Sequence, residues 1–180
     1  MRKLITILAF ALLMVPAFAQ NHTDYRLPDE PNRAKYIDFP SLDKGLWFAV
    51  QLTPAYSTLE GPYTVQADFI AGYRTGEFFK VGAGVSPKYS AAEGFAIPVF
   101  LDLRGNLISQ ESRMAVPYWN LDAGYTFGSY KGLYVSPTVG VRVGMPRNNF
   151  IAGLTYILQQ MGPGGFTPSH SVGLRIGYEF

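Results

Sequence analysis

The residues best suited to catalysis lie near the end of this 180-residue chain, where Ser169, His170 and Ser171 precede Glu179. A serine hydroxyl beside a histidine, with a carboxylate that orients the ring, is the arrangement that many hydrolases use. In an extended chain, however, Glu179 lies roughly 30 Å from His170, and no other carboxylate adjoins the histidine. The sequence therefore predicts no catalytic residues and no enzyme activity.

The sequence also contains no pattern that predicts a metal site or a cofactor site. The two histidines, His22 and His170, are isolated from each other, and the chain has no cysteine, so neither a metal site nor a disulfide is expected. The glycines alternate along apolar segments instead of opening a helix, which argues against a phosphate-binding loop. We expect no cofactor.

The formal net charge of +2 comes from the first residues of the chain. Arg2 and Lys3 begin an N-terminus in which an apolar run leads to a small residue at Ala17 and another at Ala19, a pattern typical of a cleaved signal peptide over 1–19. The remaining chain has 13 basic and 13 acidic residues, so nucleic-acid binding is not expected. Residues 20–45 are polar and lack periodicity, which indicates a flexible periplasmic lead-in.

From residue 46 onward, apolar and polar residues alternate with a period of two, as in β-strands with two different faces. The runs are about as long as the ~9–11 residues that a tilted membrane strand needs. They cover 46–58, 63–74, 78–89, 95–104, 118–127, 133–143, 149–159 and a last strand that ends at Phe180. The fold class predicted for 46–180 is all-β, an eight-stranded antiparallel up-and-down transmembrane β-barrel, because only a closed sheet can cross a bilayer with strands.

The glycines indicate which face of the barrel is inside. Most strand glycines fall on the polar face, where small residues would make room for long Arg, Lys and Tyr side chains in a narrow lumen. Charges of both signs lie on the same face and must pair if they are enclosed. This predicted lumen network consists of Asp68, Arg74, Lys80, Asp102, Arg104, Asp122, Arg142, Arg175 and Glu179. A soluble barrel would place the apolar face inside instead.

Three segments resemble the small outer-membrane β-barrel domain family of Gram-negative bacteria, which includes OmpA-, OmpX- and OmpW-like barrels. They are residues 97–104, 121–128 and 173–180. The resemblance implies a location in the outer membrane, contact with its lipid, and delivery by the barrel-assembly machinery. It also implies that the alternating C-terminal residues form the assembly signal, namely Val172, Leu174, Ile176, Tyr178 and Phe180.

If the last strand ends in the periplasm, the connections at 75–77, 105–117 and 144–148 face that side, and 105–117 is unexpectedly long. Four prolines, which cannot donate to the sheet ladder, then fall in the outer half: Pro54, Pro87, Pro98 and Pro137. Local bulges would explain them. Alternatively, Pro87 and Pro98 mark a weakened lateral seam, an opening that resemblance to OmpW-like barrels would imply.

Three functions remain open from the sequence. The first is a non-enzymatic barrel with a mostly closed, charge-paired lumen and a structural or accessory role in the cell envelope. The second is a narrow or laterally open channel for small apolar or anionic solutes. The third is a soluble lipid-binding barrel, which requires the reverse assignment of the faces.

Overall fold

The structure is a computed structural model that describes residues 44–57, 63–91, 94–110, 113–145, 147–161 and 167–180. The expected leader at 1–19 and nearly all of the lead-in at 20–45 lie outside these residues. The strands are β1 Gly45–Ser57, β2 Thr64–Arg74, β3 Lys80–Val85, β4 Lys88–Ser90, β5 Gly94–Asn106, β6 Ala115–Gly128, β7 Gly132–Met145, β8 Asn148–Met161 and β9 Thr167–Glu179. Among the described residues, no helix is long and apolar enough to cross a membrane.

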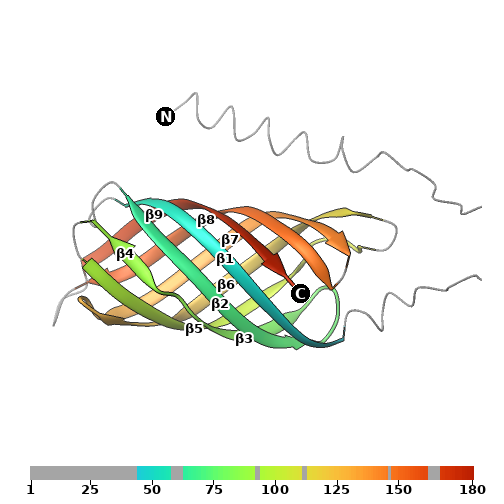
Figure 1. The fold of residues 1–180 in the computed structure, drawn as a ribbon, viewed down its shortest axis with the longest axis horizontal. Coiled ribbons are helices and arrows are strands. Elements are labelled where there is room, and N and C mark those ends of the chain that lie inside the picture. Colours follow the sequence, from blue (N-terminus) through green and yellow to red (C-terminus); the bar gives the residue numbers. More distant parts are fainter. Residues whose placement is uncertain (1–43, 58–62, 92–93, 111–112, 146, 162–166) are drawn as a thin grey trace, which may run out of the picture. The chain divides into compact units, whose positions relative to one another are not determined.

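The strands β3 and β4 are two parts of one barrel strand. Both pair with β2 on one side and with β5 on the other, and the register of each pairing is the same before and after the break at Ser86 and Pro87. Every other strand pairs with its neighbour in sequence, and β9 pairs with β1. The sheet is therefore a closed antiparallel barrel of eight strands (Figure 1), as predicted.

The strands are strongly tilted against the barrel axis (Figure 1). The tilt follows from the stagger between neighbouring strands. The stagger can be measured by stepping once around the barrel from each residue to the residue directly opposite it on the next strand. This path runs through Gly45, Arg74, Lys80, Arg104, Asn120, Thr138, Thr155, Gly173 and Ala55. The path thus returns to β1 ten residues beyond its start, a stagger that goes with a strand tilt of roughly 35–45°.

The polar face is inside the barrel and the apolar face is outside. Lys80 and Arg104 are fully buried, whereas Leu101 is 63% exposed and Val172 58% exposed. This is the orientation of a barrel surrounded by lipid, with alternate residues facing the bilayer and the lumen. The reading as a soluble lipid-binding barrel is wrong, because it required the opposite orientation.

The barrel has two distinct ends. At the N/C end, β1 begins and β9 stops (Figure 1), and the turns 75–79, 107–114 and 146–147 connect strands. The opposite end is called the loop end. The predicted turn 105–117 is shorter than expected, because β5 extends to Asn106 and β6 begins at Ala115. Pro117 is consequently a further strand proline, opposite Val141 near the N/C end, whereas Pro54, Pro87, Pro98 and Pro137 lie in the half of the barrel toward the loop end.

Candidate functional site: the charged lumen

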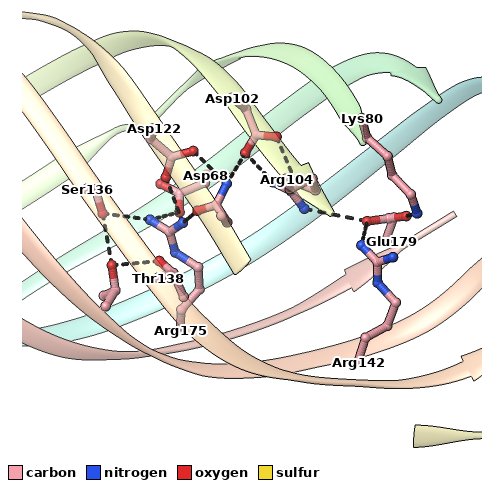
Figure 2. A network of polar contacts seen from close by, with 12 residues as sticks. Asp68, Lys80, Asp102, Arg104, Asp122, Ser136, Thr138, Arg142, Arg175 and Glu179 are labelled. Atoms are coloured by element: carbon pink, nitrogen blue, oxygen red, sulfur yellow. Dashed lines mark hydrogen bonds and ion pairs between the residues drawn. The ribbon is translucent and has the colours of Figure 1, made fainter. Parts of the chain in front are cut away.

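The structure places all nine charged residues of the predicted lumen network inside the barrel, each at most 1% exposed. They come from β2, β3, β5, β6, β7 and β9, and the period-two alternation of these strands directs them inward. Lys88, on β4, is also buried. Figure 2 shows one group around Glu179 near the N/C end and one group around the aspartates deeper in the lumen, and Arg104 links the two groups.

Glu179 is the centre of the group near the N/C end. Its Oε1 accepts hydrogen bonds from Lys80 Nζ at 2.9 Å and Arg74 Nη2 at 3.2 Å. Its Oε2 accepts from Arg142 Nη2 at 3.0 Å and lies 3.5 Å from Arg104 Nη1. One carboxylate therefore holds four cations from four different strands.

The deeper group contains the three aspartates and Arg175 (Figure 2). Asp102 and Asp122 face each other directly across β5 and β6, a position in which like charges repel. The amide of Asn120 donates to both carboxylates, and Arg104 binds Asp102 through two nitrogens. Arg175 Nη1 binds Asp122 Oδ2 at 2.6 Å. These donors offset the repulsion between the opposed aspartates.

Asp68 joins the deeper group to neutral residues. Its Oδ2 lies 3.6 Å from Arg175 Nη2, and its Oδ1 accepts hydrogen bonds from Ser86 Oγ and Gln66 Nε2. Gln66 Nε2 also donates to the hydroxyl of Tyr134 at 3.0 Å. The network thus continues from ion pairs into neutral hydrogen bonds, which link β2 to β7 across the lumen.

An apolar column also fills the lumen, and its residues were not among the predicted lumen residues. Its buried members are Trp47, Ala49, Ala55, Ile70, Phe100, Tyr134 and Ile157. The guanidinium of Arg104 lies 4.5 Å from the ring centroid of Trp47, a cation–π contact. The signal was present in the sequence, since strand parity places Trp47 and Phe100 on the same face as the charges.

Some inward glycines make room for these aromatic rings, whereas Gly153 lies beside the Tyr118 hydroxyl and Gly177 beside the Gln51 side chain, so the predicted room for long polar and tyrosine side chains holds only in part. A Cβ at Gly82 would lie 3.0 Å from Trp47, and one at Gly84 would lie 2.7 Å from the ring of Phe100. The small residues on the polar face are therefore complementary to specific large ones. The result is a packed lumen, as is usual for eight-stranded barrels.

The serine and histidine residues of the C-terminal segment are separated by the barrel wall. Ser169 and Ser171 are buried in the lumen, where Ser169 Oγ lies 3.1 Å from Ser57 Oγ. His170 faces outward and contacts the hydroxyl of Tyr156. These serines and this histidine cannot act as a nucleophile and its base.

The proposed assembly-signal residues Val172, Leu174, Ile176, Tyr178 and Phe180 all face outward. Phe180 closes the barrel seam, since its backbone exchanges hydrogen bonds of 2.8 and 2.9 Å with Phe48. Its ring stacks on Phe48 with centroids 5.9 Å apart. The role of these residues as a recognition signal stays a prediction.

Pro87 lies in the break between β3 and β4, and Pro98 lies opposite Ser86 on the neighbouring strand β5. Pro87 O accepts from Ala67 N at 3.0 Å, and Pro98 O accepts from Ser86 N at 2.9 Å. In a hydrogen-bonded pair of an antiparallel ladder, the two opposed residues normally exchange two backbone hydrogen bonds. Each proline has no N–H, so it accepts one of these bonds but cannot donate the other to the opposite carbonyl. Two adjacent ladder bonds are therefore missing without any bulge, since the register is unchanged across the break.

Comparisons with known proteins give structural relatives only. No protein-family model and no curated protein sequence matches the chain. The structure of Neisserial surface protein A is similar with a TM-score of 0.60 and 12% identity, over 74% of this chain and 95% of that one. The N-terminal β-barrel domain of Pseudomonas aeruginosa OprF aligns with a TM-score of 0.47 and 13% identity, over 76% and 99% of the two chains.

The outer membrane protein OprG from Pseudomonas aeruginosa aligns with a TM-score of 0.43 and 12% identity, over 75% of this chain and 94% of that one. The fold conclusion depends on the first comparison, which covers nearly the whole of its relative. Together with the apolar exterior and the closed strand order, it confirms the predicted resemblance at the level of the fold. The chain is a small eight-stranded transmembrane β-barrel with the fold of Neisserial surface protein A.

Proposed function

We propose that this protein is a closed barrel of the outer membrane that contributes to the cell envelope as a structural or accessory component. The observation that carries the proposal is the filled lumen. Ion pairs join side chains from different strands across it, and none of the nine charged residues of the lumen network is more than 1% exposed. A conducting pore needs water and mobile ions along its length. In the proposed topology the N/C end faces the periplasm, and the assembly machinery recognises the C-terminal strand.

The closed lumen predicts that the purified barrel does not conduct in planar lipid bilayers. The refolded sample is first checked in SDS, where a folded barrel should change its mobility on boiling. A frequent, stable conductance from such a sample would contradict the closed lumen. The protein would then be better explained as a narrow channel. Such a channel should prefer anions, because six basic and four acidic side chains face inward when Lys88 is included.

A lateral route for apolar solutes is the second candidate function, favoured by the two missing ladder bonds at Pro87 and Pro98. Pro87→Ala with Pro98→Ala restores both N–H groups, so we expect slower transfer of an apolar fluorescent probe between vesicles and the lumen. Pro54→Ala with Pro137→Ala is the control, because these prolines lie within β1 and β7 and away from the break between β3 and β4. Equal transfer by wild type and both double variants would discard the lateral route.

A further inference from the structure

At the N/C end, the polar residues Ser109 and Gln110 of the turn after β5 lie at the mouth of the lumen. Ser109 Oγ and Gln110 N both donate to Glu77 Oε2, at 3.1 and 2.9 Å. The side-chain amide of Gln110 reaches across to donate to Gly144 O at 2.7 Å. These contacts direct the polar side of the turn inward, and Gln110 is buried.

The apolar residues of the same turn are directed outward. Leu107, Ile108 and Met114 are 57%, 39% and 70% exposed. Leu107 N donates to Pro117 O at 2.9 Å, which continues the β5–β6 register past the end of the strand. Leu107 consequently extends the outward column that includes Leu101 on β5.

The exposed apolar surface continues onto the neighbouring turns. Phe78, in the turn between β2 and β3, is 53% exposed, and Met145, at the end of β7, is 59% exposed. The turns are tied together, because Asn106 N donates to Glu77 O and Gly144 N donates to Met114 O. Between β7 and β1, the exposed polar residues at this end are Lys44, Arg147 and Asn148, and the exposed apolar residues beside them are Leu46, Phe150 and Phe180.

We propose that Leu107, Ile108 and Met114, in the described parts of this turn, lie in the lipid interface at the N/C end and insert between lipid molecules. The occupant of this surface is lipid because the surface is continuous with the outward columns that the bilayer already covers. A turn in open water would expose its apolar residues in one patch without a partner. The turn therefore has two roles at once, since its polar side closes the lumen and its apolar side anchors the barrel edge.

Single-cysteine labelling tests this placement directly, because the chain has no cysteine of its own. We would prepare Ile108→Cys and Met114→Cys, with Arg113→Cys as the matched control in the same turn and Leu101→Cys as the reference in the bilayer. Each variant carries a nitrobenzoxadiazole label and is refolded into phosphatidylcholine vesicles. Quenching is measured with nitroxide-labelled lipid and with aqueous iodide, after heat-modifiable mobility confirms folding.

Labels at 108 and 114 should be quenched by lipid with a nitroxide near its headgroup and protected from iodide, whereas the label at 113 should be quenched by iodide. Equal iodide quenching at 108, 113 and 114 would overturn the proposal. Iodide access in pure lipid combined with protection in native envelopes would also overturn it, because a protein partner would then cover the turn.

Discussion

Replacing Glu179 by glutamine should destabilise the barrel by about 3–5 kcal/mol, the cost of removing one partner from a buried ion pair. Lys80, Arg74 and Arg142 each bind this carboxylate within 3.2 Å, and all are buried. A neutral amide cannot compensate their charges. Urea unfolding in phosphatidylcholine vesicles, followed by tryptophan fluorescence, measures the change.

The matched control is Glu77→Gln, at the edge of the mouth. Its oxygen accepts two hydrogen bonds from neutral donors, Ser109 and Gln110, and an amide oxygen can accept both, so a loss of at most about 1 kcal/mol is expected. Lys80→Gln should also cost less than Glu179→Gln, because three arginines remain around the carboxylate. If Glu179→Gln unfolds at the wild-type urea concentration, the group near the N/C end is hydrated and does not hold the strands together.

The number of strands and the side of the sheet that each residue faces could be predicted, because a period-two alternation repeats in every strand. A slip of one residue would move charges such as Asp102 and Arg104 into lipid, so the sequence strongly constrains the register. The limits of the strands were less certain. The turn after β5 was overestimated at both of its ends, because β5 includes Gly105 and Asn106 and β6 begins at Ala115, two residues before Pro117.

The partners within the lumen could not be predicted. Alternation gives the direction of a side chain, but contacts across the barrel depend on the stagger that closes the sheet. Glu179 on β9 meets Lys80 on β3 because of that closure, not because of any nearness in sequence. The same reason explains why the apolar column was missed, since alternation directs Trp47 and Phe100 into the lumen without showing that they lie in one apolar column.

The second large loss of stability is expected when Gly84 is replaced by alanine, because this glycine packs against an aromatic ring. Alanine in place of glycine would by itself favour a strand by roughly 0.5–1 kcal/mol. At Gly84, however, a Cβ would lie 2.7 and 2.9 Å from two ring atoms of Phe100 and 3.0 Å from Ile70. Overpacking of this kind costs about 1–3 kcal/mol, so Gly84→Ala should be destabilising despite the gain in strand propensity.

Phe100→Leu provides the decisive comparison, because it removes the ring atoms that the new methyl group would meet. The double variant Gly84→Ala with Phe100→Leu should lose less stability than the sum of the two single changes, with an interaction of about 1 kcal/mol or more. At Gly124 the same exchange should not be rescued by Phe100→Leu, since the closest atom there is Val99 O of the backbone, 2.0 Å away. Additive losses at Gly84 would mean that Phe100 can move aside, and the lumen would then be loosely packed at mid-depth instead of closed by a fixed aromatic side chain.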